Sequence, residues 1–592
     1  MSVQNDLKEL LFQWGEGLLQ TQVRNSQSKR LNGTFLCPAC TVVHGRSFDA
    51  MYAFLLIAEE KNDSRYRQAA IDLFTWADHT LSLPNGAFLN DVDSSWLGTT
   101  VFAAINLADC LLDFSNLLGE EAVRMMTVRL RAAAEFIYGL ESLMHNNINY
   151  PLSNALALHL CSIVFADERY ARRAAELAEL LPSVLTENHL LFGEGVPRTK
   201  ISNRGCRSVD IGYNVEETLP NVLRYAQLID DEDLIDLTMR SILAHLWFFL
   251  EDGGWDNSFG TRNFKWTYWG SRTSDGSLPI LLALAERDSR YGSLVQRHVS
   301  LLQKATVNNL LLGGPHYHQA GQEACVHHTF EHISMVAKIL KHSRLEQIDW
   351  DSGTLEVLPR KRHVGLKEFK ELATWVTVKP TYNATITAYD WPYMVGGHVS
   401  GGTLSLLYGF QTGVILAASM GEYTLRERKN QQVPYGVIHE CLALRIEETR
   451  DETTYSSIYD TSAGVLWNDQ GDVCTVMGTL RNSNGEELGN GSFYTFEYRF
   501  LEDRITIVFA SEAGKLVIPI ISRSDETIET TAEKVLITKD KATVTLESKP
   551  GFELPYGEER IFNLCPGFQA LRIDVPSKNK KQRIHLSWKY NK

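Results

Sequence analysis

The spacing of apolar residues divides the chain into two parts. From residue 5 to about residue 342, apolar residues recur every three or four positions, as in Ala69, Leu73, Trp76 and Ala77, which is the period of an amphipathic α-helix. This period predicts about twelve helices, near residues 5–22, 47–60, 64–81, 99–117, 120–141, 151–164, 167–181, 214–229, 232–251, 277–286, 290–304 and 327–341. Short polar connections favour antiparallel helical hairpins, and their irregular spacing argues against a repeat array. We therefore expect a ring of helical pairs.

After about residue 350 the pattern alternates with a period of two. The alternating segments are rich in Thr, Val, Tyr and Ile and are separated by turn residues such as NSNGEE, as expected for antiparallel strands; they cover residues 374–389, 402–410, 492–500, 503–511 and 534–548. These patterns predict an α+β multidomain protein, with an (α/α) toroid at residues 1–345 and an antiparallel β-sandwich at residues 346–592.

Composition and charge narrow the class of protein. The 592 residues are 44% hydrophobic and 22% charged, which excludes intrinsic disorder. The formal net charge of -14 argues against a nucleic-acid binder. No apolar run reaches the ~18 residues of a membrane helix, so we expect no membrane insertion. Because the first residues lack a secretory signal pattern, we expect a cytoplasmic protein as written, or a periplasmic or secreted one if a signal was trimmed.

Residues 253–276 form a loop too long for a simple connector and are rich in aromatic and basic side chains. Aromatic rings stack on sugar rings, and guanidinium groups bind carboxylates through paired hydrogen bonds. The combination favours a charged carbohydrate ligand, with a sugar platform of Trp255, Trp266, Tyr268 and Trp269 and anion binding by Arg262 and Arg272. The alternative is a packed cap whose rings fill the interior of the toroid.

Three further loops contribute candidate residues. Residues 189–214 carry four basic side chains against two acidic ones, including Arg207, and end at Tyr213; this local positive charge in an acidic protein indicates an anion subsite or a solvated basic loop. The asparagine-rich stretch before Pro151 and the loop 313–321 offer neutral donors, aromatic rings and histidines, namely Asn147, Asn149, Tyr150, His316, Tyr317 and His318. In an extended loop, the two histidines would face the same way.

The nine cysteines are too few and too scattered for a disulfide scaffold. Cys37 and Cys40 have the C-x2-C spacing of a zinc site, with His44 following, and further ligands could come from Cys325, His327, His328 or His332. The half-sites lie far apart in sequence, so the favoured interpretation is that His44 and Arg46 line a pocket, with Asp49 orienting one of them. No cofactor is expected to be required, and a structural zinc or calcium ion is an open alternative.

Four motifs resemble a known family: FLCPACTVVHGR (35–46), DIGYNVEETLP (210–220), the segment 253–276 and ACVHHTFEH (324–332). A helical toroid followed by a β-sandwich resembles the polysaccharide lyases of the heparinase, chondroitinase and alginate lyase type. The motifs are similar to those of bacterial lyases that remove L-rhamnose linked α-1,4 to D-glucuronate in arabinogalactan. The resemblance implies an acidic oligo- or polysaccharide substrate.

The resemblance also implies β-elimination at a uronic acid. A base removes the C5 proton, the C4–O bond breaks, and a 4,5-unsaturated product remains; the substrate carboxylate must be neutralised for this to occur. We assign proton exchange to Tyr213, with Tyr150 and Tyr317 as rivals, and name His44 as the partner base. The candidates for neutralising the carboxylate are Arg46, Arg207, Arg262 and Arg272, with Asn147 or Asn149 as a neutral alternative.

Three other classes remain open. A glycoside hydrolase on the same toroid would use a pair of carboxylates chosen from Asp91, Asp210, Glu216 and Asp256. A non-catalytic carbohydrate-binding protein would use the same aromatic and basic loops. A zinc-dependent enzyme built on Cys37, Cys40 and residues 325–332 is a third possibility.

Overall fold

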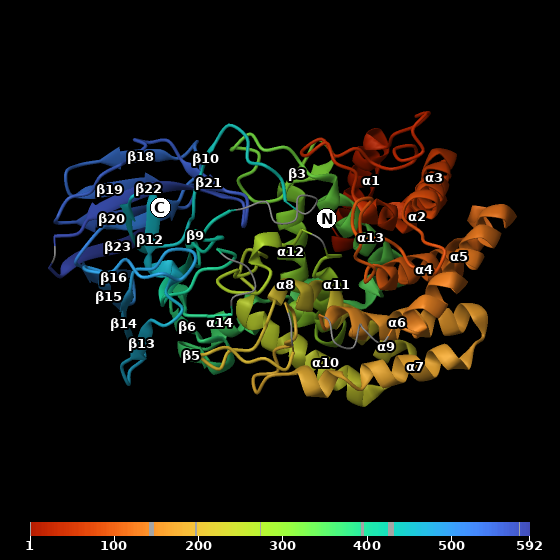
Figure 1. Cartoon of the computed structure of the whole chain (residues 1–592), viewed down its shortest axis with the longest axis horizontal. Helices are drawn as coiled ribbons and strands as arrows, with labels where there is room; N and C mark the ends of the chain where they lie inside the picture. Colours follow the sequence, from red (N-terminus) through yellow and green to blue (C-terminus); the bar gives the residue numbers. More distant parts are fainter. Residues whose placement is uncertain are drawn as a thin grey trace.

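The computed structural model describes residues 2–140, 147–195, 198–272, 274–391, 396–423, 431–578 and 580–591. A helical region and a β region lie beside each other, with the N-terminal helices at one end of the molecule and the C-terminal strands at the other (Figure 1). The division of the sequence into two periods is thus also a division in space.

The helices form antiparallel pairs, each an inner helix packed on an outer one. Their bounds are α1 Val3–Thr21, α2 Met51–Lys61, α3 Ser64–Thr80, α4 Thr100–Leu118, α5 Glu120–Tyr138, α6 Asn149–Phe165, α7 Glu168–Ala178, α8 Ile211–Tyr213, α9 Leu219–Leu228, α10 Glu232–His245, α11 Leu278–Arg287, α12 Gly292–Lys304 and α13 Val326–His342. The inner helices α2, α4, α6, α9, α11 and α13 contact one another in that order, and α13 contacts α2. This closes the ring and confirms the predicted toroid.

Burial distinguishes the two layers of helices. The inner helix α2 is buried continuously from Met51 to Ala58, because it has neighbours on both sides as well as an outer partner. The outer helix α7 buries only Tyr170, Ala174, Leu177 and Ala178. Outer helices therefore carry the clear amphipathic period, whereas inner ones are apolar on several faces.

Helix α4 is long and apolar enough to cross a membrane by length and composition, with 72% of its most apolar window buried inside the protein. Its Asp109 is buried and accepts hydrogen bonds from Arg224, at 2.6 and 2.9 Å, and pairs with Lys338 at 3.0 Å. A buried carboxylate with two cationic partners is typical of a helix packed in a protein core. By length and composition, α4 is thus an exception to the expectation that no apolar run is long enough for a membrane helix.

The β region contains three sheets around a shared apolar core. The five-stranded sheet has the order β5-β6-β7-β8-β9, the six-stranded sheet β10-β21-β22-β17-β11-β12, and the eight-stranded sheet β13-β14-β15-β16-β23-β20-β19-β18. Tyr382, Phe496 and Ile518, one from each sheet, belong to the same core cluster. Every pairing in these sheets is antiparallel except that of β10 with β21, so the predicted antiparallel β domain is confirmed.

The strands have the following bounds: β5 Gly365–Phe369, β6 Thr374–Lys379, β7 Tyr382–Thr387, β8 Thr403–Gly409, β9 Gly413–Ala417, β10 Ile438–His439, β11 Arg445–Arg450, β12 Thr453–Ser456, β13 Gly464–Trp467, β14 Val473–Thr479, β15 Phe493–Phe500, β16 Arg504–Ser511, β17 Lys515–Ile521, β18 Thr527–Thr530, β19 Lys534–Thr538, β20 Ala542–Ser548, β21 Ile561–Asn563, β22 Phe568–Pro576 and β23 Gln582–Tyr590. The alternating burial along β15 and β20 shows why these segments have a period of two. Short strand pairs β1–β2 (Trp266–Thr267 and Gly270–Ser271) and β3–β4 (Thr306–Val307 and Leu310–Leu311) belong to the helical region.

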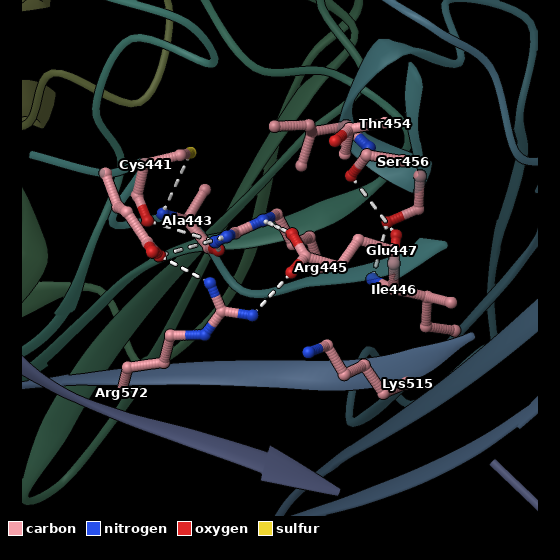
Figure 2. A network of polar contacts seen from close by, with 12 residues as sticks. Cys441, Ala443, Arg445, Ile446, Glu447, Thr454, Ser456, Lys515 and Arg572 are labelled. Atoms are coloured by element: carbon pink, nitrogen blue, oxygen red, sulfur yellow. Dashed lines mark hydrogen bonds and ion pairs between the residues drawn. The ribbon is translucent and has the colours of Figure 1, made fainter. Parts of the chain in front are cut away.

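A charge-paired network connects strands of the six-stranded sheet (Figure 2). Glu447 on β11 pairs with Arg445 at 2.7 Å and with Arg572 on β22 at 2.5 Å. Arg572 also pairs with Asp574 at 2.8 Å and with Glu440 at 2.5 Å. Because the charges are mutually compensated, we interpret the network as a structural connection between strands.

The two regions meet through buried polar contacts as well as apolar ones. Arg360, on the short helix α14 (Pro359–Arg362), pairs with Asp256 of the loop 253–276 at 2.5 Å. The same carboxylate oxygen accepts a hydrogen bond from Thr385 on β7 at 2.6 Å, and Arg360 donates to Asn383 at 3.0 Å. Asp256 therefore connects the helical region with the first sheet of the β region.

Candidate active site

A buried polar cluster lies at the N-terminal ends of the inner helices. These ends gather at one end of the ring because the inner helices run alongside one another and each outer helix returns the chain to the same end. The cluster combines the segment before α2, the start of α6, the loops 189–210 and 253–276, and α13; its members include Arg46, Asp49, Asn149, Glu194, Asp210, Tyr213, Glu217, Arg262, Lys265, Asp275 and Glu331. Segments far apart in sequence thus supply one site.

Tyr213 ends the one-turn helix α8, which Asp210 caps. One carboxylate oxygen of Asp210 accepts a hydrogen bond from the backbone N–H of Tyr213 at 3.1 Å. The other accepts from the backbone N–H of Arg262 at 2.7 Å. An N-cap aspartate fixes the first turn of a helix, and here the same side chain also fixes the loop that carries Arg262. Asp210 therefore fixes the backbone positions of Tyr213 and Arg262 relative to each other.

Two cations surround the Tyr213 ring. The guanidinium carbon of Arg262 lies 4.8 Å from the ring centre, and Lys265 Nζ donates to the Tyr213 hydroxyl at 3.4 Å. The three residues keep small exposed fractions of 5%, 6% and 5% respectively, so each reaches the surface at one edge. Positive charges at these positions stabilise negative charge on a phenolate oxygen or on a bound carboxylate. This arrangement suits a tyrosine that exchanges protons beside an anionic substrate.

Asn149 lies between two buried glutamates. Its backbone N–H donates to Glu194 at 2.9 Å and its side-chain amide donates to Glu217 at 2.8 Å. Burial raises the pKa of Glu194 to about 8, against the opposing effect of Arg262. Burial likewise raises the pKa of Glu217 to about 7, against the opposing effect of Arg46. Both carboxyl groups therefore titrate near neutral pH, as groups that handle protons require.

A π-helical turn, Asn214–Thr218, directs two consecutive glutamates to different partners. Glu216 accepts a hydrogen bond from the backbone N–H of Ser271 at 2.8 Å, whereas Glu217 faces Asn149. Gly270 is required at this contact, because a Cβ atom there would lie 1.4 Å from a carboxylate oxygen of Glu216. The sequence predicted one continuous helix at residues 214–229, and the structure replaces its first turn with this wider one, a feature that often accompanies functional sites.

Arg46 is enclosed by carboxylates. Its guanidinium pairs with Asp49 at 2.8 Å, Glu331 at 3.1 Å, Asp275 at 3.2 Å and Glu217 at 3.4 Å. Although burial opposes its charge, these carboxylates raise the pKa of Arg46 well above its usual value. A guanidinium committed to four carboxylates has little capacity to bind another, so we assign Arg46 to holding the site together. Neutralisation of the substrate carboxylate by Arg46 stays a prediction, and these contacts do not support it.

His44 faces cysteines and not the Tyr213 centre. Its Nε2 atom lies 3.6 Å from Cys40 Sγ and 3.7 Å from Cys325 Sγ, and the residue is 1% exposed. A general base must come within hydrogen-bond reach of the proton that it removes. The assignment of His44 as partner base is therefore corrected. Its ligand atom instead belongs to a group with those of Cys37, Cys40 and Cys325, all within 4.8 Å of one another.

The expected sugar platform is also corrected. Trp255, Trp266 and Trp269 are completely buried and Tyr268 is 3% exposed. Trp255 donates to Ser277 at 3.2 Å and Trp266 to Asp210 at 3.3 Å, while Tyr268 donates to Asp252 at 3.0 Å. Burial of these large rings in the interior stabilises the fold. These four residues instead match the alternative interpretation, in which the loop is a packed cap whose rings fill the interior of the toroid.

Arg272 and residues 316–318 lie where the two regions meet. Arg272 is 2% exposed and donates to Gln432 at 3.0 Å, and Tyr317 is completely buried with its hydroxyl donating to the Leu564 carbonyl at 2.9 Å. His316 accepts from the backbone N–H of Gln569 at 3.0 Å, whereas His318 is exposed. The loop turns here, so the two histidines do not face the same way. The substrate-binding roles expected of Arg272, His316 and Tyr317 stay predictions, whereas the contacts described here connect the two regions.

Three other candidates lie beside the cluster. Asn147 is half-buried and accepts from the backbone N–H of Gly195 at 3.1 Å; Asn146, before it, is outside the described residues. Tyr150 accepts a hydrogen bond from Trp96 at 2.8 Å, and burial raises its pKa, which favours the protonated phenol. Arg207 is half-buried and its guanidinium lies 4.8 Å from the Phe192 ring centre. Asn147 and Arg207 keep enough exposure to contact a ligand.

The carboxylates proposed for a hydrolase have structural partners. Asp91 accepts from the backbone N–H of Gly45 at 2.9 Å, Asp256 pairs with Arg360, and Asp210 and Glu216 bind backbone N–H groups as described. Each therefore holds a loop in place. This favours elimination over hydrolysis.

Comparison with known proteins supports the same chemistry. Residues 11–355 match the Ulvan lyase N-terminal domain and residues 366–591 the Ulvan lyase C-terminal domain. The chain belongs to the ulvan lyase family. It is 34% identical to the broad-specificity ulvan lyase of Formosa agariphila over 97% of this chain and 92% of that protein. The protein is thus a polysaccharide lyase, as the sequence motifs predicted, whereas the narrower likeness to rhamnose–glucuronate lyases of arabinogalactan is not supported.

Solved structures share the fold of this lyase at low identity. Chondroitin AC lyase of Streptomyces coelicolor superposes with a TM-score of 0.53 and 12% identity, covering 99% of this chain and 79% of that one. Xanthan lyase of Paenibacillus superposes with a TM-score of 0.55 and 10% identity, covering 99% of this chain and 57% of that one. These likenesses confirm the helical toroid followed by a β domain.

Sequence reasoning missed several members of the cluster as site residues. Lys265 and Glu194 lie in loops that the sequence singles out, but their charge alone does not distinguish them from the other charged residues there. Glu331 lies one helical turn after His327, with which it pairs at 3.4 Å. That i, i+4 spacing on α13 was the available signal. The burial of Glu331 has no other local signature in the sequence.

Proposed function

We propose that this lyase degrades ulvan or a closely similar acidic polysaccharide by β-elimination at a uronic acid, with Tyr213 exchanging the protons. The single observation that carries the assignment is the position of Tyr213 between Arg262 and Lys265, oriented by the carboxylate that also orients Arg262. The family match supports ulvan as the first polymer to test.

The chemistry requires three actions from the protein. A uronate C5–H is weakly acidic while the neighbouring carboxylate is ionised, so that charge must be neutralised as an enolate develops. Arg262 and Lys265 supply positive charge beside Tyr213 for this purpose. The Tyr213 phenolate takes the C5 proton, the C4–O bond breaks with formation of the C4=C5 double bond, and the resulting phenol returns the proton to the departing oxygen. One residue then serves as base and as acid.

Nearby carboxyl groups complete the proposed site. Glu194 pairs with Arg262 at 3.6 Å and also accepts from Asn149. With its pKa raised to about 8, Glu194 is partly protonated at neutral pH, so that it does not fully cancel the charge of Arg262. The guanidinium is thereby left able to attract a substrate carboxylate.

The deciding experiment incubates the purified protein with ulvan and follows the ultraviolet absorbance of the conjugated C4=C5 double bond. Chondroitin, heparan sulfate and rhamnose-capped arabinogalactan serve as parallel substrates. We expect the absorbance to rise with ulvan. New reducing ends without that absorbance would mean hydrolysis, and a rise with arabinogalactan alone, accompanied by free rhamnose, would restore the narrower specificity.

The role of Tyr213 is tested with a matched pair of variants. Tyr213→Phe removes the hydroxyl that exchanges protons, and we expect a loss of turnover of about 10²–10⁴-fold, the usual contribution of a positioned acid or base. Tyr150→Phe removes a neighbouring hydroxyl whose described contact is with Trp96, and we expect less than about tenfold loss. Equal losses, or a larger loss in Tyr150→Phe, would contradict the assignment. Circular dichroism checks that both variants are folded.

A further inference from the structure

Four potential metal ligands converge where the helical ring closes. Cys37, Cys40 and His44 come from the segment before α2, and Cys325 is the residue immediately before α13. Their ligand atoms all lie within 4.8 Å of one another. Cys37, His44 and Cys325 are buried, with exposed fractions of 0%, 1% and 5%, while Cys40 is partly exposed.

Three of the six distances between these atoms fit the edges of a metal-centred tetrahedron. Cys37 Sγ and Cys325 Sγ are 3.6 Å apart, and His44 Nε2 lies 3.6 Å from Cys40 Sγ and 3.7 Å from Cys325 Sγ. Zinc–sulfur bonds of about 2.3 Å and zinc–nitrogen bonds of about 2.0 Å in a tetrahedral site imply edges of about 3.5–3.8 Å. A disulfide would require a sulfur–sulfur distance of about 2.05 Å. The spacing thus fits a shared metal and not a covalent bond.

The backbone of the C-x2-C segment is folded into a tight turn. The Thr41 N–H donates to the Cys37 carbonyl at 2.9 Å, and Thr41 has a φ of 54°. A left-handed conformation is unusual for a β-branched residue and is retained where the surrounding structure requires it. The turn brings Cys37 and Cys40 to the same side, which is the arrangement that C-x2-C zinc sites use.

The ligand chemistry identifies the metal. We propose that Cys37, Cys40, His44 and Cys325 bind one zinc ion, which joins the first inner helix of the toroid to the last. Thiolates and imidazole select zinc over calcium, which prefers oxygen ligands. Four protein ligands leave no open position for water or substrate, so the ion is structural.

The position of this site in the fold gives the ion its role. Along the inner ring, α2, α4, α6, α9, α11 and α13 follow one another in chain order, and the contact between α13 and α2 closes the ring between inner helices from opposite ends of the helical region, where α1 also packs on α13. The zinc ion fastens this seam at the end of the ring that carries the active-site cluster. His44 also precedes Arg46 by two residues, and Arg46 pairs with Glu331 on α13 at 3.1 Å. The ion therefore supports the placement of Arg46.

The test measures metal content of the full-length protein by plasma mass spectrometry after purification without chelators. We expect about one zinc ion per chain. Cys325→Ala removes a ligand and is expected to abolish the bound zinc. Cys161→Ala is the matched control, because Cys161 is also a buried cysteine of an inner helix but lies outside the cluster; it should keep the metal.

A second measurement remains informative if Cys325→Ala fails to fold. Cobalt(II) added to chelator-treated wild-type protein should give the intense absorption of a tetrahedral thiolate site, at about one ion per chain. Removal of zinc should lower the thermal midpoint, and added zinc should restore it. Wild-type protein without zinc that takes up no cobalt, or a Cys37–Cys325 disulfide found by mass spectrometry, would overturn the proposal. Zinc content is independent of lyase activity, so either proposal can fail without the other.

Discussion

Asp210 shows how one side chain can hold together two loops of the proposed active site. Its two carboxylate oxygens bind the backbone N–H groups of Tyr213 and Arg262, which belong to different loops. Trp266 donates to the same carboxylate at 3.3 Å and closes off the buried side. The backbones of Tyr213 and of its cationic neighbour Arg262 are therefore fixed relative to each other through the Asp210 carboxylate.

Glu194 should make the stability of the protein depend on pH. The pKa of Glu194 is about 8 in the folded protein, against an ordinary value of 4.5. Its contribution to the free energy of unfolding is therefore fully present below about pH 4.5 and is lost as the pH rises through 8. Glu194→Gln should reduce the decline in unfolding free energy between pH 5 and 8 by up to about 1.4 kcal/mol per pH unit. Urea denaturation at several pH values measures this slope.

An exposed glutamate serves as the control for this experiment. Arg124 lowers the pKa of Glu121, so Glu121 is ionised throughout the window. Glu121→Gln should leave the slope unchanged. A slope in Glu194→Gln that is identical to that of the wild type would mean that Glu194 is ionised in the folded protein at pH 5, contrary to the effect of its burial.

Individual residues were predicted with uneven success. Tyr213 and Arg262 stood out because they lie in loops of unusual composition, and the structure brings them together. Trp255, Trp266 and Trp269 stood out for the same reason but are buried. Composition reveals that a loop is rich in aromatic rings, but whether a ring faces a ligand or the interior depends on packing against distant segments.

Among the elements, the six-stranded sheet is held by charge as well as by apolar packing. Arg572 on β22 contacts Glu440, Glu447 and Asp574, so it bridges β22, β11 and the segment after β10. Figure 2 shows Arg572 and Arg445 directed toward the same region next to Glu447. The negative charges of Glu440, Glu447 and Asp574 are neutralised by a small number of cations. The loss of one cation therefore leaves buried negative charge uncompensated.

Arg572→Met should therefore be strongly destabilising. Its side chain is 9% exposed, and breaking such a buried pair costs about 3–5 kcal/mol of unfolding free energy. Lys515→Met is the matched control: Lys515 pairs with the same Asp574 at 2.7 Å but is 39% exposed, and the expected cost is below about 1 kcal/mol. Chemical denaturation measures both. Similar values for the two variants would show that Arg572 is not the central cation of the network.

Element boundaries were predicted best where the period was clear. The strands β6, β7, β8, β15, β16, β19 and β20 lie within the predicted alternating segments, and α3 begins at Ser64 as expected. Asp63, whose carboxylate accepts from the backbone N–H of Arg65, marks that start as an N-cap. The π-helical turn at Asn214–Thr218 was not predictable, because its widened geometry follows from contacts of Glu216 and Glu217 with other segments.

At the scale of the whole molecule, a buried carboxylate is one of the contacts that join the helical and β regions. Asp256 pairs with Arg360 and accepts from Thr385, while Arg360 also donates to Asn383. The side chains of Asp256 and Arg360 are 0% and 2% exposed. Opening of the interface would separate this buried pair, which would then lose its partners. The pair therefore stabilises the observed orientation of the two regions.

Asp256→Ala leaves the Arg360 guanidinium buried without this partner. We expect a loss of about 3–5 kcal/mol in unfolding free energy, and separate melting of the two regions in differential scanning calorimetry. Asp236→Ala is the control, because Asp236 pairs with Arg287 at the surface, with side chains 66% and 45% exposed; its expected cost is below about 1 kcal/mol. A cost for Asp256→Ala no larger than that of the control would show that the pair does not hold the interface.

The sequence by itself determined the two-part architecture, the type of most elements and the loops that supply the site, because hydrophobic period and turn composition are local properties of the chain. Tertiary structure alone decided which loop residues meet. Cys37 and Cys325 are 288 positions apart and become neighbours only because the helical ring closes between α13 and α2. Packing of the loop 253–276 against distant segments likewise buries its aromatic rings and places Arg262 and Lys265 beside Tyr213. Such contacts follow from how the helices pack and have no counterpart in the local pattern of residues.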